Sequence, residues 1–250
     1  MSFSLEDPLR ALCILHDAFS TTGLIGAALR ARGWEVDELT IVPAERYAAP
    51  DVEFEFPDHR DYDLIVPMGA PWAAYDDAAI GSWLTPELKW LAETVDEGGA
   101  VFGICFGGQA LARALGGSVA LGARPEIGWT VIEPTPESDG IVTSGPWFEW
   151  HFDAFTPPPG ATVLARNEAA TQAYRVGRSL GVQFHPEVTA MDISMWLDNG
   201  GEAQVRALGI DPADLLAEAA RQGTDARARA EALTDSYLQK IFADQTVSVG

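Results

Sequence analysis

Short apolar runs and helix-like periodicities take turns through the first half of the chain. Apolar runs predict buried strands over Leu9–Leu15 and Leu64–Val66, and an alternation of apolar and polar residues predicts another over Trp34–Ile41. Between them, apolar residues at helical spacing predict a helix around Leu24–Leu29 and a second helix that opens at Pro86. Because strands that alternate with helices pair in parallel, this half predicts a parallel sheet with helices on both faces.

The second half has a different rhythm, with short strand candidates that are separated by turns rather than by helices. These candidates are Val119-Ala120, Gly128–Ile132, Thr162–Ala165, Ala173–Val176 and Leu180–Phe184. Without helical crossovers between them, we expect these strands to pair antiparallel. From about Thr189 to about Phe242 the pattern is helical. These last helices could cover the sheet or join two subunits in a homodimer, and covering is the favoured interpretation.

The composition is that of an ordinary globular protein with an unusual charge. Of the 250 residues 47% are hydrophobic and 21% are charged, but the formal net charge is −21. Nucleic acids and anionic membrane surfaces carry charge of the same sign, so we expect neither as a partner. The residues after Met1 lack the pattern of a signal peptide, and no apolar stretch is long enough to span a bilayer. With Cys13 and Cys105 as its two cysteines, the chain has no disulfide framework, and we expect a cytoplasmic location.

The stretch V-F-G-I-C-F-G-G-Q, residues 101–109, combines an apolar run, a cysteine and the start of a helical pattern. A strand, a sharp turn and a helix in this order form a nucleophile elbow, which lifts one side chain out of the sheet. The helix dipole then favours the thiolate form of Cys105. Gly103, Gly107 and Gly108 leave room for a substrate to approach the backbone. On this stretch alone, a buried structural cysteine is an equal alternative.

A histidine and a glutamate two residues apart follow the last predicted strand, in G-V-Q-F-H-P-E. A cysteine nucleophile needs a base that can also donate a proton, and the imidazole of His185 can serve near neutral pH. Glu187 is positioned to accept a hydrogen bond from the other ring nitrogen. An exposed histidine is the simpler interpretation of this pair alone, but the cysteine elbow favours a catalytic role. Gly69 and Cys105 both follow predicted parallel strands, and such sheets bind ligands beyond those strand ends.

These motifs together resemble a known family. G-I-C-F-G-G-Q around Cys105 and G-V-Q-F-H-P-E around His185 look like the two signatures of the class I (triad-type) glutamine amidotransferases. M-G-A-P-W-A-A-Y-D-D, P-E-I-G-W and W-H-F-D also resemble stand-alone members that are similar to the amidotransferase domain of GMP synthase. The resemblance implies a flavodoxin-like, mostly parallel central sheet flanked by helices, with a small antiparallel strand set. It assigns residues 1–198 to the amidotransferase domain and residues 199–250 to a helical extension packed on it.

The resemblance implies a reaction and a role for each matching residue. Cys105 would attack the side-chain amide carbon of glutamine and form a γ-glutamyl thioester. His185 would protonate the leaving ammonia and then activate a water molecule against the thioester, while Glu187 would orient His185. Glutamate and ammonia would be the products, with no cofactor and no metal.

Backbone N–H groups would hold the oxyanion that develops during this attack. The resemblance assigns them to Gly69 and Ala70, in the turn after the third strand, and to Phe106, which follows the nucleophile. Ala70 departs from the second glycine that the family often has, and an L-residue is restricted where φ must be positive. The donor in this turn therefore stays open between the two residues.

Further residues are assigned to the substrate or its surroundings by the same resemblance. Gln109, one helical turn after the cysteine, would contact the bound glutamine, with a solvent-facing residue as the alternative. The segment Trp147-Phe148-Glu149 resembles the one that holds the amino-acid end of glutamine through main-chain groups. His151 and Asp153 resemble a His-x-Asp pair near the site and are interpreted as structural. Glu126 either forms a hydrogen bond within the site or lies exposed in a loop.

Three functions are compatible with these residues. The first is a glutaminase that passes ammonia to a separate synthase, since no ATP-pyrophosphatase domain or P-loop follows in this sequence. The second is a hydrolase of another γ-glutamyl amide or peptide. The third is a non-catalytic regulatory relative, which the intact set of Cys105, His185 and Glu187 disfavours.

Overall fold

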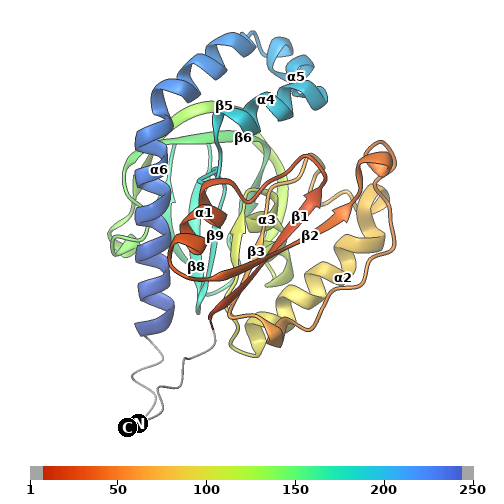
Figure 1. Cartoon of the computed structure of the whole chain (residues 1–250), viewed down its shortest axis with the longest axis vertical. Coiled ribbons are helices and arrows are strands. Elements are labelled where there is room, and N and C mark those ends of the chain that lie inside the picture. Colours follow the sequence, from red (N-terminus) through yellow and green to blue (C-terminus); the bar gives the residue numbers. More distant parts are fainter. Residues whose placement is uncertain (1–7, 244–250) are drawn as a thin grey trace.

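The computed structural model describes residues 8–243 and shows an α/β fold in which helices flank a curled array of strands (Figure 1). The start of the chain, where no signal peptide is expected, lies outside the described residues. Within the described range, no helix has both the length and the apolar character that a membrane crossing requires.

The first sheet is parallel, as the alternation of strands and helices predicts. Its order is β2-β1-β3. The strands are β1 (Arg10–Asp17), β2 (Glu35–Val42) and β3 (Leu64–Pro67). β1 lies in the middle and is buried on both faces, which explains why its sequence is a continuous apolar run rather than an alternation.

The second sheet begins with the strand that leads to the cysteine, and its order is β4-β9-β8-β7-β5-β6. The strands are β4 (Phe102–Ile104), β5 (Ser118–Pro134), β6 (Gly145–Thr156), β7 (Thr162–Arg166), β8 (Thr171–Val176) and β9 (Ser179–Val182). A parallel bridge between Ile65 and Val101 joins this sheet to β3. β9 pairs parallel with β4 and antiparallel with β8, so the expected antiparallel pairing holds on one edge of this strand only.

A long hairpin of β5 and β6 extends the antiparallel part, and the sequence predicts it incompletely. Two short strands are expected inside β5, which is one strand with an irregularity between Leu121 and Glu126, and none is expected over β6. Trp147 and Phe148 are adjacent in β6 and both are buried, so this strand has no simple alternation of apolar and polar residues.

The helices divide the core into two layers on opposite faces of the sheet. They are α1 (Gly23–Ala31), α2 (Asp77–Asp96), α3 (Phe106–Ala114), α4 (Ala190–Trp196), α5 (Glu202–Ala207) and α6 (Pro212–Ala243). Because side chains alternate along a strand, Ala11, Cys13 and Leu15 of β1 pack with α1 and α6. Leu12 and Ile14 of the same strand pack on the other face with α2 and α3.

Helix α2 begins nine residues before the predicted start at Pro86, so that prediction is wrong. The side chain of Asp76 accepts a hydrogen bond from the Ala79 amide and caps the helix. A proline inside a helix costs about 3 kcal/mol. Full burial of Ile80 and Trp83 in the turns before Pro86 stabilises them by about 1.5–3 kcal/mol each, which offsets that cost.

The last helix, α6, covers the sheet, as the favoured interpretation of the C-terminal pattern has it. Figure 1 shows α6 along one side of the molecule, beside α1. Leu233 and Tyr237 of α6 belong to the same core cluster as β1. The Tyr237 hydroxyl lies 3.1 Å from the carbonyl oxygen of Val101 and 2.8 Å from that of Arg178, next to the starts of β4 and β9.

Candidate active site

The cysteine elbow has the geometry that its sequence predicts. β4 ends at Ile104, α3 begins at Phe106, and Cys105 between them has φ +49°, a strained value for a residue with a side chain. The Cys105 amide donates to the carbonyl oxygen of Val182 at 2.9 Å, which fixes the turn to β9. A β-carbon at Gly107 would lie 2.0 Å from the Pro67 carbonyl oxygen, so the tight turn requires glycine there.

The histidine arrives from the neighbouring strand. Ile104 pairs with Val182 in the parallel ladder of β4 and β9, so the residues beyond both strands emerge at the same edge of the sheet. His185 and Glu187 are buried, and His185 Nδ1 lies 2.7 Å from Glu187 Oε1. The structure therefore brings Cys105, His185 and Glu187 together from positions eighty residues apart in sequence.

The charge of the imidazole is set by its two partners. Burial alone would lower the pKa of His185, but the charges of Glu187 and Cys105, with hydrogen bonds to both, raise it well above its ordinary value. A protonated imidazole beside a sulfur favours the thiolate–imidazolium form of the pair. This form provides a nucleophile and a proton donor in one site.

Two free amides lie beside this pair. A β-carbon at Gly69 would lie 3.0 Å from His185 Cε1 and 3.9 Å from Cys105 Cβ, so the turn after β3 passes directly over the reacting groups. Among the described residues, no hydrogen-bond partner is found for the amides of Ala70 and Phe106. Phe106 is the first residue of α3, where an amide has no partner within the helix. Both amides are free to bind an oxyanion.

A buried histidine that sequence analysis missed supports this turn. His16, at the end of β1, lies with Nδ1 3.3 Å from the carbonyl oxygen of Gly69. Its Nε2 lies 3.0 Å from Oε1 of Glu87 in α2, and both side chains are fully buried. Burial would lower the pKa of His16, but the charge of Glu87 raises it. The two residues are seventy-one positions apart, so only a polar residue closing an apolar strand hinted at this contact.

A cavity of about 380 Å³ opens above the cysteine. Side chains or backbone of Cys105, His185, Gly69, Ala70, Phe106 and Gln109 line it, together with Asp17, Phe19, Ser20, Tyr47, Pro71, Trp72, Ala73, Tyr75, Leu121, Trp150, His151, Phe152, Asp153, Trp196, Asn199, Gly201 and Gln204. The amide nitrogen of Gln109 lies 3.2 Å from the Asp153 carbonyl oxygen and 3.3 Å from Gln183 Oε1. The solvent-facing alternative for Gln109 is therefore wrong, since this side chain is buried at the cavity.

The segment Trp147-Phe148-Glu149 does not reach the cavity. Trp147 packs on Phe184 with ring centres 4.5 Å apart, and Phe148 and Glu149 are fully buried. The next residues of β6, 150–153, line the cavity instead, and the Trp150 carbonyl oxygen lies 4.0 Å from Cys105 Sγ. The main chain that faces the nucleophile thus lies one to four residues later than the resemblance implies.

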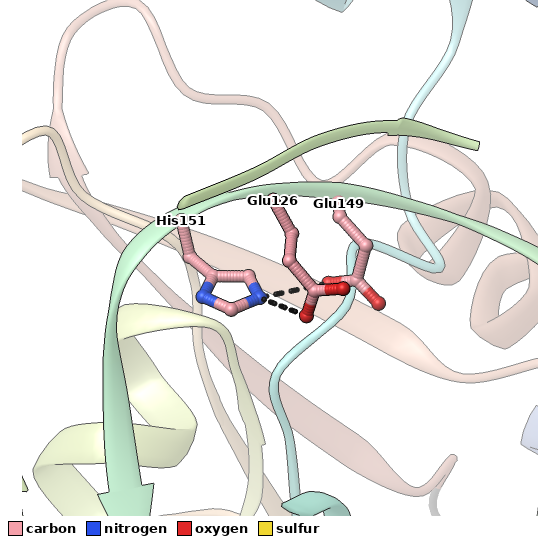
Figure 2. A group of neighbouring side chains, drawn as sticks. All are labelled: Glu126, Glu149 and His151. Carbon is pink, nitrogen blue, oxygen red and sulfur yellow. Dashed lines mark ion pairs between the residues drawn. The ribbon is translucent and has the colours of Figure 1, made fainter. Parts of the chain in front are cut away.

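Glu126, Glu149 and His151 form a buried cluster behind this wall (Figure 2). His151 Nε2 lies 3.2 Å from Glu126 Oε2 and 3.3 Å from Glu149 Oε2, while its Nδ1 lies 3.0 Å from the Asp153 carbonyl oxygen. Burial would lower the pKa of His151, but the two carboxylates raise it to about 10. Burial raises the pKa of Glu149 to about 6, although His151 opposes this. The exposed alternative for Glu126 is therefore wrong.

The same three residues offer ligand atoms within 4.8 Å of one another, close enough for a metal ion. The Glu126 carboxylate, however, already accepts from Asn167 at 2.8 Å and from Gln172 at 3.0 Å. An imidazolium at His151 balances the remaining charge, so the cluster is accounted for as a charge-paired support of residues 149–153.

Comparison with known proteins identifies the family of this site. The family model for class-I glutamine amidotransferases matches residues 14–199. The amidotransferase-like GMP synthase subunit from Sulfurisphaera tokodaii, described as glutamine-hydrolyzing, is 33% identical over 140 residues, which are 52% of this chain and 69% of the relative. The glutamine-hydrolyzing GMP synthase of Nitratidesulfovibrio vulgaris is 38% identical over 120 residues, which are 44% of this chain but only 23% of the relative.

Solved structures extend the likeness to nearly the whole described fold. A glutamine amidotransferase of Thermotoga maritima superposes with a TM-score of 0.78 at 27% identity, over 93% of this chain and 97% of the other. One from Methylobacillus flagellatus gives a TM-score of 0.78 at 26% identity, over 93% and 94%. Since the family model matches well over half of its residues, the chain belongs to the class-I glutamine amidotransferase family.

Proposed function

We propose that this chain hydrolyses the side-chain amide of glutamine, or a related γ-glutamyl amide, through a thioester on Cys105. The observation that carries the proposal is the strained elbow at Cys105 next to a buried His185, which is held at 2.7 Å by Glu187 on the floor of a cavity. The family match supports the same chemistry.

The proposed reaction begins with attack of the Cys105 sulfur on the amide carbon. The carbonyl oxygen gains negative charge and is stabilised by the free amides of Ala70 and Phe106. His185 gives a proton to the amide nitrogen, the carbon–nitrogen bond breaks, and the amine or ammonia leaves. His185 then takes a proton from water, which attacks the thioester and releases glutamate.

Substrate binding is proposed for the groups that line the cavity rather than for the earlier part of β6. Gln109 and the main chain of residues 150–153 are positioned to hold the glutamyl part. Trp147, Phe148 and Glu149 would act by holding this main chain in place from behind. Free Cys13 and Cys105 support action in a reducing compartment, which fits the cytoplasm.

We also propose that ammonia released from glutamine passes to a separate synthase. The relative from Sulfurisphaera tokodaii is named as one subunit of a synthase, and the chain spans only a quarter of the length of the longer relatives that it matches. The identity of such a partner is a matter for co-purification with the native complex.

The test is turnover by the purified chain. Glutamate and ammonia should appear from glutamine or another γ-glutamyl amide, and mass spectrometry should find a γ-glutamyl adduct on Cys105. Cys105→Ala should abolish both while leaving the melting temperature unchanged. Failure of every amide to react, with an unreactive Cys105, would support the non-catalytic alternative.

A further inference from the structure

The cavity is larger than glutamine needs. Its volume is about 380 Å³. At a share of about 30 Å³ per water molecule, this space holds about a dozen waters. Glutamine has about ten non-hydrogen atoms, and these are bonded at distances much shorter than the spacing between waters. A bound glutamine therefore leaves a large part of the cavity unfilled.

The spare space lies among aromatic rings. Phe19 and Tyr47 meet edge to face with ring centres 5.0 Å apart, and Tyr47 meets Trp72 at 5.8 Å. All three line the cavity and are only half-buried. Trp196 lies with its ring centre 5.0 Å from that of His185 and adds a fourth ring.

The chemistry of the elbow decides which part of a substrate meets these rings. The nitrogen that leaves must receive its proton from His185, so the leaving amine occupies the His185 side, next to Trp196. Tyr47 belongs to the same side, because its hydroxyl lies 3.4 Å from the carbonyl oxygen of Asn199, just after α4. Gln109 and Asp153 are hydrogen-bonded to each other and serve the glutamyl part.

The polar groups of the wall limit the kind of amine. No arginine or lysine occurs among the described residues that line the cavity, so nothing there pairs with a carboxylate on the leaving group. The carboxylate of Asp17 already accepts from the Phe19 amide and the Ser20 hydroxyl, both at 2.7 Å. Asp153 accepts from the Tyr75 hydroxyl at 3.0 Å. Neither acid is left unpartnered for a cationic amine.

We propose that the site is a hydrolase site for γ-glutamyl amides of apolar, aromatic amines, with Phe19, Tyr47, Trp72 and Trp196 as the pocket for the amine. This inference rests on the proposed function and names its substrate class. The overall reaction converts the amide and one water into glutamate and the free amine. Cys105 forms the thioester as the carbon–nitrogen bond breaks, His185 protonates the amine, and water returns that proton as it cleaves the thioester.

The test is a substrate series on the full chain. Five amides are compared by kcat/KM: glutamine, γ-glutamyl ethylamide, γ-glutamyl benzylamide, γ-glutamyl glycine and mono-γ-glutamyl putrescine. We expect the benzylamide to exceed glutamine by about tenfold or more, because the ring buries apolar surface that the amide of glutamine lacks. The carboxylate-bearing and cationic amides should both fall below the benzylamide.

A matched pair of tyrosine variants separates the pocket from general effects on folding. Tyr47→Ala should lower the ratio of benzylamide to glutamine kcat/KM by about fivefold, since one aromatic contact is lost. Tyr62→Ala is the control, because Tyr62 is also half-buried but lies outside this cavity. Tyr62→Ala should leave the ratio unchanged, and the melting temperature of each variant reports on its folding.

Two results would overturn the inference while leaving the proposed function intact. One is rapid hydrolysis of glutamine with a benzylamide that is neither cleaved nor inhibitory. The other is a preference for the glycine or putrescine amide. If no amide of the series reacts and Cys105 is not acylated, the proposed function itself has failed, and the inference fails with it.

Discussion

His16 donates through Nδ1 to the carbonyl oxygen of Gly69 over 3.3 Å, below the turn that passes over the nucleophile. The C=O of Gly69 and the N–H of Ala70 belong to one planar peptide and point in opposite directions. Fixing the carbonyl toward His16 therefore fixes the Ala70 amide on the other side of the peptide, where an oxyanion donor is required. Glu87 in turn holds His16 at 3.0 Å.

The first prediction concerns this pair. The double variant His16→Phe/Glu87→Leu should keep the fold, because replacing a buried ion pair by apolar residues is often neutral for stability. Its kcat should nevertheless fall by about tenfold to a hundredfold, since the full loss of an oxyanion donor costs about 10²–10³ and here the donor is only misaligned. KM should change little, and steady-state kinetics on glutamine checks both.

A second His–Glu pair provides the control for this variant. His59 and Glu97 lie 3.1 Å apart, far from the cavity, with Glu97 exposed. His59→Phe/Glu97→Leu should leave kcat unchanged. An unchanged kcat in the His16 variant at an unchanged melting temperature would show that the pair is structural only.

The second prediction contrasts the two cysteines. Burial raises the pKa of Cys13 to about 12, so this thiol stays protonated and unreactive in the folded chain. Cys105 lies beside a protonated imidazole and should react rapidly with iodoacetamide at neutral pH. Peptide mass spectrometry against time should find the label on Cys105 alone. Equal, slow labelling of both would contradict an activated thiolate.

The third prediction concerns Glu187. Because its charge raises the pKa of His185, Glu187→Gln should lower that pKa and reduce the thiolate–imidazolium population. kcat/KM at neutral pH should fall by about 10²–10⁴, the usual contribution of acid–base catalysis. The basic limb of the pH profile should also move to lower pH. Glu93→Gln, which alters an exposed pair with Lys89, should show neither change.

The fourth prediction is a pH dependence of stability that His151 controls. The folded chain holds the His151 proton up to about pH 10, whereas an ordinary histidine releases it near pH 6.5. The stabilisation is therefore complete below pH 6.5 and is lost as the pH rises toward about 10. Urea unfolding across this interval should show a decline in the free energy of unfolding, which is shallower in His151→Gln. A parallel decline in both proteins would assign it to other groups.

Sequence was sufficient where the relevant signals are local. The elbow depends on adjacent residues, an apolar run, Cys105 and its glycines, and the first sheet follows from apolar runs such as that of β1. The late motif at His185 is also local, and the parallel pairing of β4 and β9 then brings it to the cysteine.

Sequence was insufficient where distant packing or strand register decides. The start of α2 depends on how deeply Trp83 is buried, which no local pattern shows against a proline at position 86. In β6, neighbouring residues face opposite sides, so a small shift decides whether Glu149 or Trp150 meets the cavity. The contact of His16 with Gly69 joins the ends of two strands and exists only in the folded sheet.

The hydroxyl of Tyr237 gives the far end of the gene a stake in the chemistry. It reaches the backbone beside the two strands that carry the nucleophile and its base, although it lies more than fifty residues beyond either. A premature stop codon near position 198 would spare every proposed catalytic residue. It would still remove this hydroxyl and the helix that carries it, uncovering the core beneath α1. Such a shortened product should be degraded or inert despite an intact set of catalytic side chains.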